Sequence, residues 1–210
     1  MTVPSAIASF AVVAGVLTII PGLDTALVLR AAVTKGRRHA FATAVGISSG
    51  ALLWGALAAL GATAVLTASH VAYTALRIAG ALYLTWMGAS MLRHSFRRLS
   101  AEPDLPQGTA SDGTLLRSWT RGLTTNLLNP KIGVFYMAML PQFIPQNSPH
   151  LLMGLALAGV HDVEGIVWFT GLIFSAHLAG RWLRGGAAHR VLDRITGCVL
   201  IGFGIKLASE

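Results

Sequence analysis

Charged residues are scarce in this chain of 210 residues, because Asp, Glu, Lys and Arg together make up only 11% of it. A typical soluble domain carries about 25%. Between His39 and Leu76 there is no charged residue at all, and such a run has room for a membrane helix of about 20 residues. With 54% hydrophobic residues, the chain is predicted to be an all-α integral membrane protein rather than an ordinary soluble domain.

Three further absences narrow the function. The single cysteine, Cys198, excludes an internal disulfide. No GxxxxGK[ST] phosphate loop occurs, so neither a self-contained ATP-driven pump nor a bound cofactor is expected. No basic segment precedes the first apolar run, so we expect this run to remain as a spanning helix rather than to be cleaved as a signal peptide.

Hydropathy, Pro and Gly divide the chain into apolar runs. A polar stretch rich in Pro, Gly, Ser and mixed charges has the composition of a linker. We therefore expect one transmembrane domain over residues 1–210, with a repeat at about 1–92, a cytoplasmic linker at about 93–118 and a second repeat at about 119–210. The six predicted spans lie at residues 5–29, 41–67, 71–92, 120–141, 151–179 and 191–208.

Basic residues gather at alternate connections between the spans. The net charge of +8 therefore comes from residues whose positions set the orientation of the protein in the membrane, and no nucleic-acid partner is expected. Six spans with both termini outside place all of these residues in the cytoplasm, whereas five or seven spans would divide them. They make up 13 of the 16 Lys and Arg residues and are Arg30, Lys35, Arg37 and Arg38; Arg93, Arg97, Arg98, Arg117 and Arg121; and Arg181, Arg184, Arg190 and Arg194.

An odd number of spans in each half makes the second half enter the membrane from the opposite side, which is the geometry of an inverted repeat in secondary transporters. The first span of each half contains a helix breaker beside a charge. These are Pro21-Gly22 with Asp24, and Asn129-Pro130 with Lys131. Breakers at matching positions of two repeats indicate a binding site.

Both charges are predicted to lie inside the membrane. Asp24 is six residues, about 9 Å of helix, from Arg30, and Lys131 is ten residues, about 15 Å, from Arg121. Helix breaks also expose unpaired backbone groups, so a zwitterionic amino acid matches the site, with its amino group on Asp24 and its carboxylate on Lys131. Asp24 is also able to carry a proton. The structural alternative is a salt bridge between the two side chains.

A second polar cluster, His161, Asp162 and Glu164, falls within the fifth predicted span. Ionisable groups at this depth are expected to face the bundle interior or water, where they form either a proton relay or a set of counter-charges for Lys131 or Arg77. A hydrolytic metal site built on His161 and Glu164 is a weaker alternative. No HExxH motif occurs and His177, the next histidine, is 16 residues away, so no metal is expected.

Gly46 and Gly50 form a GxxxG motif in the second span. Such motifs allow helices to approach closely. The sequence leaves open whether the partner helix lies within the chain or across a homodimer.

The chain resembles the LysE/RhtB family of bacterial amino-acid exporters over nearly its whole length. The resemblance rests on IIPGLDTALVLR, GISSGALLW, GALYLTWMGASMLR, GLTTNLLNPKIGVFY and LDRITGCVLIGFGIKLA. It implies six helices in the bacterial inner membrane and export of amino acids or derivatives, driven by the proton gradient or the membrane potential. Export of divalent cations is the alternative within transport.

Carried over residue by residue, the resemblance places the family's Pro-Gly motif on Pro21 and Gly22, its adjacent polar position on Asp24, and its NPK motif on residues 129–131. Many relatives have a second proline where this chain has Leu23. A milder break is therefore expected in the first span.

Overall fold

The computed structural model describes residues 1–20, 22–68 and 113–176, with the backbone alone for 62–68, and isolated positions within 71–93 and 194–205. The third and sixth predicted spans lie outside the described residues apart from those positions, as does Pro21. Every element in the described part is a helix, as the sequence predicts. These elements are α1 (Val3–Ile19), α2 (Leu23–Thr34), α3 (Arg37–Ala68), α5 (Leu115–Leu127), α6 (Pro130–Met139), the 3-10 helix η1 (Leu140–Phe143) and α7 (His150–Phe174).

Two of the described helices are long and apolar enough to cross a membrane. They are α3, over Arg37–Gly61, and α7, over His150–Phe174. α1 and α2 meet the same criterion together, as one span bent by 55° at the break between them. The second and fifth predicted spans therefore correspond to α3 and α7.

The first and fourth predicted spans are each divided into two helices. α1 ends at Ile19 and α2 begins at Leu23, with Gly22 as its N-cap. α5 ends at Leu127, and α6 begins at Pro130 with Asn129 as its N-cap. Proline is well suited to the first position of a helix because its missing N–H would have no partner there.

A tight turn joins α2 to α3. The backbone N–H of Lys35 donates to the carbonyl of Ala31 at 2.9 Å and closes the last turn of α2. Gly36 follows with φ of 86°, in the left-handed region that glycine adopts without steric cost. The chain can therefore reverse direction at once, and α3 packs back along α2.

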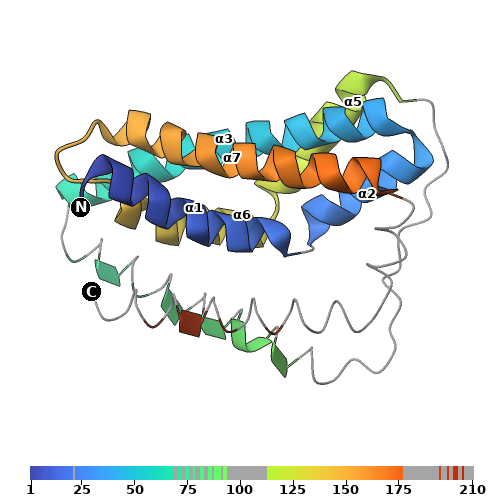
Figure 1. Ribbon diagram of the computed structural model, residues 1–210. Helices are drawn as coiled ribbons and strands as arrows, with labels where there is room; N and C mark the ends of the chain where they lie inside the picture. The colour runs from blue at the N-terminus through green and yellow to red at the C-terminus, as the bar shows by residue number, and fades with distance from the viewer. Residues whose placement is uncertain are drawn as a thin grey trace.

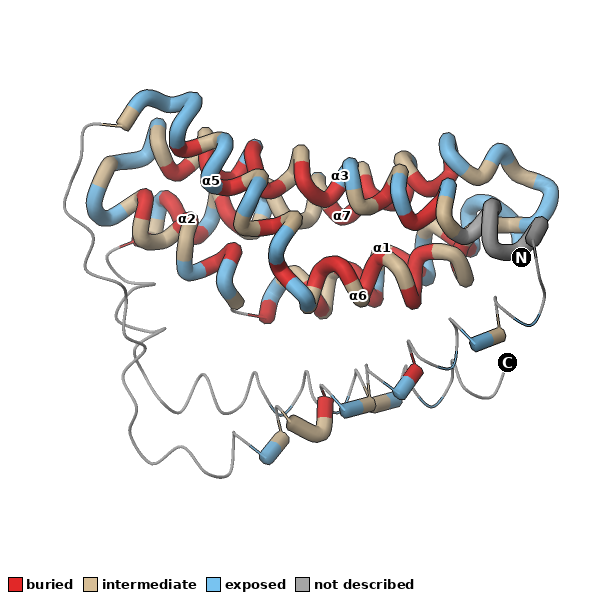
Figure 2. Tube along the Cα trace, turned by 180° about the vertical axis from the view of Figure 1, so that it is seen from behind, coloured by how far each residue is buried: buried red, intermediate tan, exposed pale blue. Residues whose placement is uncertain are grey.

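The helices lie side by side, with α3 and α7 in one layer and α1 with α6 in another (Figure 1). Buried residues follow the faces that these layers turn toward each other (Figure 2). They form two clusters. The α1–α6 cluster includes Phe10, Phe135, Tyr136, Leu140 and Leu157, and the α2–α3 cluster includes Val28, Ala44, Ile47, Phe169 and Ile173.

Glycines bring α3 into contact with α5 and α7. A Cβ on Gly46 would overlap the carbonyl oxygen of Trp119, and one on Gly50 would lie 2.7 Å from Oδ1 of Asn126. Both glycines of the GxxxG motif thus face α5 within the same chain. On the other side of α3, a Cβ on Gly55 would lie 2.6 Å from the Cβ of Ala158 in α7.

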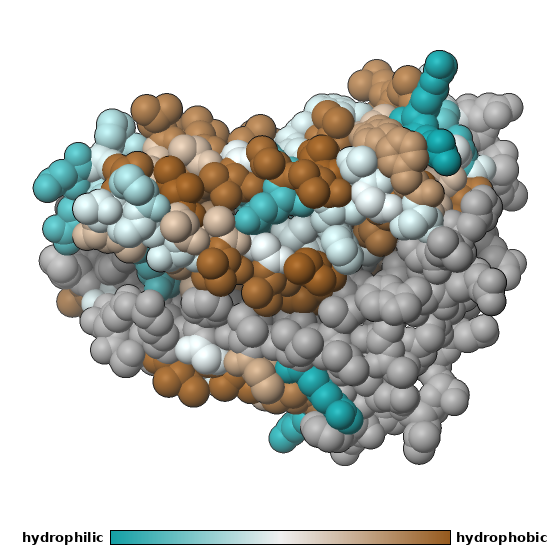
Figure 3. Space-filling view, in the orientation of Figure 1, coloured by the Kyte–Doolittle hydropathy of each residue, from teal (hydrophilic) through white to brown (hydrophobic). Residues whose placement is uncertain are grey.

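The outward faces of the helices are apolar. Val163 and Val167 of α7 are 66% and 68% exposed. In the space-filling view, apolar residues cover much of the face that carries α7 and α1, and hydrophilic residues gather mainly toward its ends (Figure 3). Exposed apolar surface of this extent suits contact with lipid.

Candidate functional site

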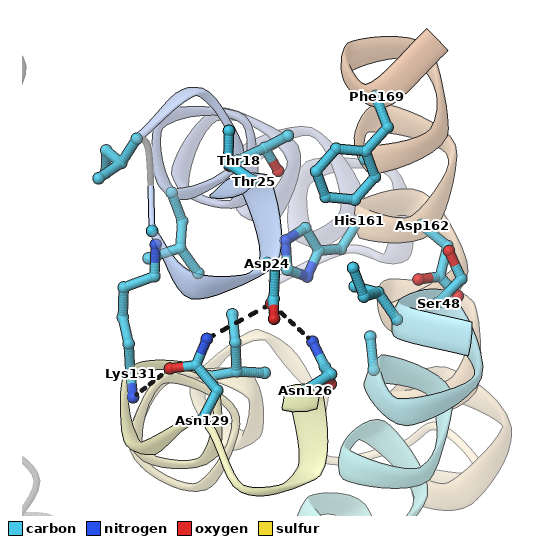
Figure 4. Close-up of a pocket in the computed structure, with 17 residues that line it drawn as sticks. Thr18, Asp24, Thr25, Ser48, Asn126, Asn129, Lys131, His161, Asp162 and Phe169 are labelled. Carbon is cyan, nitrogen blue, oxygen red and sulfur yellow. Dashed lines mark hydrogen bonds between the residues drawn. The ribbon is translucent and has the colours of Figure 1, made fainter. Parts of the chain in front are cut away.

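The two helix breaks meet inside the bundle. Asp24, in the first turn of α2, accepts hydrogen bonds at Oδ2 from Nδ2 of Asn126, at 3.0 Å, and from Nδ2 of Asn129, at 3.4 Å. These donors come from the last turn of α5 and from the N-cap of α6 (Figure 4). The polar groups of one break are therefore bonded directly to those of the other.

Lys131 extends in the opposite direction, from α6 toward the first break. Its Nζ lies 3.3 Å from the position that a Cβ on Gly22 would occupy. Its backbone N–H donates to Oδ1 of Asn129 at 3.1 Å, which caps α6. Hence Asn129 both begins the half-helix that carries Lys131 and donates a hydrogen bond to Asp24.

The helix termini at the breaks strengthen this electrostatic arrangement. Gly22 has no side chain with which to cap α2, so the first N–H groups of that helix point into the break. They carry the positive end of the helix dipole, which stabilises a nearby negative charge such as Asp24. A carboxylate on a bound molecule would be stabilised in the same way.

A cavity of about 40 Å³ lies where the breaks meet. It has room for a small number of water molecules. Its apolar wall takes Ile20 and Ile132 from the α1–α6 cluster, and Ile47 and Phe169 from the α2–α3 cluster. Its polar lining consists of Thr18, Gly22, Asp24, Thr25, Ser48, Asn126, Asn129, Lys131, His161 and Asp162.

Three oxygens of the cavity-lining residues have no hydrogen-bond partner in the described part of the chain. They are Oδ1 of Asp24, Oγ1 of Thr18 and Oδ1 of Asn126, and all three are buried. A buried polar atom without a partner costs about 1–3 kcal/mol. These atoms are therefore available to a ligand or to water.

The polar cluster of α7 is directed at three different helices. Nδ1 of His161 and the hydroxyl of Tyr136 in α6 are hydrogen-bonded at 2.9 Å. Asp162 lies beside Ser48 of α3 (Figure 4). Glu164 lies against α1, with its carboxylate oxygens 3.6 and 3.7 Å from the Cβ position of Gly15.

The structure thus separates the residues that the sequence grouped together. Gly22, Asp24, Asn129, Lys131, His161 and Asp162 line the cavity, and Glu164 is not among its lining residues. Pro130 begins α6 beside the cavity, and Pro21 lies outside the described residues. The described residues contain no group of three or more His, Cys, Asp or Glu side chains arranged to hold a metal ion, and His177 lies outside them.

Comparison with known proteins gives the family. The family profile of LysE type translocators matches residues 15–210. The chain belongs to the LysE type translocator family. The resemblance predicted from the sequence is therefore confirmed, and the protein is a transporter by family.

Curated relatives of this LysE-type translocator align over most of their length. The membrane protein YrhP of Bacillus subtilis is 30% identical over 197 residues, which cover 92% of this chain and 94% of the relative. The threonine efflux protein of Escherichia coli K12 is 30% identical over 190 residues, 89% of each chain. The homoserine/homoserine lactone efflux protein of Salmonella typhimurium is 29% identical over 193 residues, 92% of this chain and 91% of the relative. No solved structure matches the chain.

The sequence analysis did not identify several residues at or beside the cavity of this translocator, among them Thr18, Ser48, Asn126 and Tyr136. Asn126 had a usable signal, because it precedes Asn129 by three residues and so lies one helical turn before the break. The other three are ordinary uncharged side chains. Only the packing of α1, α3 and α6 brings them to the site.

Proposed function

We propose that this translocator is a secondary exporter that moves an amino acid or a close derivative out of the bacterial cytoplasm. The names of its threonine and homoserine efflux relatives support this class of substrate. The observation that carries the proposal is the meeting of two broken helices at one cavity, with Asp24 and Lys131 at its edge.

The chemistry of the cavity suits a zwitterion. The carboxylates of Asp24 and Asp162 offer oxygens to an ammonium group, and Lys131 offers a positive charge to a carboxylate. The uncapped N-terminus of α2 adds N–H donors for the same carboxylate. The apolar wall of Ile47, Ile132 and Phe169 leaves space for a small aliphatic side chain.

The transport cycle requires the cavity to enlarge. A cavity of about 40 Å³ holds a few waters, whereas an amino acid such as threonine has eight non-hydrogen atoms. The α1–α6 cluster and the α2–α3 cluster each contribute to the cavity wall. We infer alternating access, in which the helices part at one cluster while the other stays closed, driven by the proton gradient or the membrane potential.

The membrane arrangement is part of the same proposal. We propose six spans in the inner membrane as two inverted three-helix repeats, at about 1–92 and 119–210, with both termini outside. The alternation of basic connections supports this orientation. The two broken first spans support the repeat.

The experiment is a counterflow assay with the purified protein in lipid vesicles. Vesicles preloaded with one unlabelled amino acid receive a trace of the same labelled compound, across a panel of amino acids and homoserine lactone. We expect labelled threonine or homoserine to accumulate transiently. Exchange of a labelled divalent cation, with no exchange of any amino acid, would instead support the cation exporter.

A further inference from the structure

The two carboxylates at the cavity differ in what surrounds them. Asp24 accepts two amide hydrogen bonds, lies at the N-terminus of α2, and faces Lys131 across the breaks. Each of these features stabilises a negative charge. These features offset part of the cost of burying the negative charge of Asp24.

Asp162 has far fewer neighbouring groups that would stabilise a negative charge. The side chain beside it is the uncharged hydroxyl of Ser48 (Figure 4). The helix that carries Ser48 supplies no counter-charge nearby, because its basic residues, Arg37 and Arg38, lie in its first turn, at least ten residues or about 15 Å from Ser48. α1 contains no charged residue over Val3–Ile19.

The position of Asp162 in α7 makes an ionised carboxylate without a counter-charge unfavourable in free energy. It is the middle residue of His150–Phe174, twelve residues and about 18 Å from each end of a helix long enough to span the membrane. An ionised carboxylate at the centre of a span costs about 2.5–3.5 kcal/mol on insertion scales. An ionised Asp162 therefore needs a positive partner.

Among the residues that the structure describes, the titratable groups around Asp162 do not supply a positive partner. Asp24 of α2 has the same sign, and Lys131 of α6 extends toward the first break at Gly22. Tyr136 of α6 and His161 of α7 are hydrogen-bonded to each other. The His161 ring also lies against Phe135, with ring centroids 6.0 Å apart, an environment that favours the neutral imidazole.

We propose that the carboxylate of Asp162 binds either one proton or the ammonium group of the cargo, and that these two occupants exclude each other. The inference rests on the proposed function, and it assigns to Asp162 the step that couples proton entry to export of the cargo. When the cargo ammonium arrives, the proton leaves the Asp162 oxygen for the cytoplasm. After the cargo is released outside, a proton from the outer medium takes its place, so one proton enters for each molecule exported.

Competition with protons gives a measurable signature. The half-saturation concentration for counterflow of threonine is measured over a series of pH values, equal on both sides of the vesicle membrane. For the unmodified protein we expect it to rise as the pH falls, approaching tenfold per pH unit once Asp162 is mostly protonated. For Asp162→Asn we expect exchange to continue with a raised half-saturation concentration that does not vary with pH, and uphill export under a pH gradient to be lost.

Glu164→Gln is the matched control, since it removes a carboxylate from the same helix but outside the cavity lining. It should retain both the pH dependence and uphill export. If Asp162→Asn keeps the pH dependence, or if Glu164→Gln loses it, the assignment to Asp162 is wrong. If the unmodified protein exchanges no amino acid at any pH, the proposed function itself is wrong.

A measurement on the unmodified protein keeps the test decisive should Asp162→Asn fail to fold. Threonine is added to the purified protein in weakly buffered detergent solution, at a pH where Asp162 of the empty protein is mostly protonated, as shown by the tenfold rise of the half-saturation concentration per pH unit. Proton release is followed with a pH-sensitive dye. We expect close to one proton released per threonine bound. Saturable threonine binding without proton release would overturn the inference.

Discussion

Asp24 and Lys131 occupy the same position in two different half-helices. Each is the second residue after an N-cap, Gly22 for α2 and Asn129 for α6, and each side chain is directed at the other break. The hydrogen bonds of Asp24 come from two asparagines rather than from Lys131. The two side chains therefore connect the breaks in opposite directions, Asp24 to the second break and Lys131 to the first, and both line the cavity.

This arrangement predicts that stability and transport respond differently to neutralising the charges. Asp24→Asn and Lys131→Met each leave one charge without its counterpart, which costs about 3 kcal/mol or more for a buried pair. The double variant should recover most of the lost thermal stability because no single charge remains. Transport should stay absent, since the ligand groups are gone.

Thermal unfolding in detergent and counterflow in vesicles measure the two properties separately. If the double variant recovers both stability and transport, Asp24 and Lys131 form only a structural link. That result would remove them from the substrate site.

Close packing of α3 on α5 predicts a sharp difference between two Gly→Ala variants. Gly46→Ala forces a methyl group into the Trp119 carbonyl and should destabilise the protein, by about 1–3 kcal/mol. Gly159→Ala on α7 meets nothing within 4 Å and should be neutral, or stabilising by up to about 1 kcal/mol. Melting temperatures of the two variants test this, and equal values would show that α3 and α5 lie farther apart.

The hydrogen bond between Tyr136 and His161 predicts the effect of Tyr136→Phe. The substitution preserves the buried ring but leaves Nδ1 of His161 without its partner, at a cost of about 1–3 kcal/mol. We expect a lower melting temperature with the pH dependence of counterflow retained, because Asp162 is untouched. Loss of that pH dependence would mean that the Tyr136–His161 pair, and not Asp162, binds the proton.

The first helix break predicts that Leu23→Pro is tolerated. Leu23 is the first residue of α2 and is 60% exposed, and this is the helical position that suits proline. The 55° bend between α1 and α2 is present without a second proline. Counterflow and melting temperature should be close to those of the unmodified protein, and a loss of either would mean that Leu23 packs on a neighbouring segment.

The sequence predicted the breaks well because their signals are local. Proline and glycine interrupt a helix wherever they fall, so Pro21-Gly22 and Pro130 located the ends of α1 and α5 to within a few residues. The charges beside them were conspicuous because apolar residues surround them. Asp24 and Lys131 could therefore be placed at one site before any packing was known.

The roles of the α7 residues were harder to predict. Spacing put His161 and Glu164 on one helical face, yet His161 lines the cavity and Glu164 lies against Gly15 outside it. Which side of a helix meets which neighbour depends on how α1, α3 and α6 pack around α7. The same holds for the GxxxG motif, whose partner proved to be α5 of the same chain.

The central claim is that the cavity between the two breaks binds an amino acid by both of its charged groups. It is tested most directly by the binding of L-threonine, threonine methyl ester and N-acetylthreonine to the purified protein and to Lys131→Met. We expect the unmodified protein to bind threonine about 10- to 100-fold more tightly than either analogue, since each analogue lacks one charged contact. Lys131→Met should prefer threonine over its methyl ester much less than the unmodified protein does, because only the N–H groups of α2 still contact the carboxylate. A preference for threonine as large as that of the unmodified protein would contradict the account.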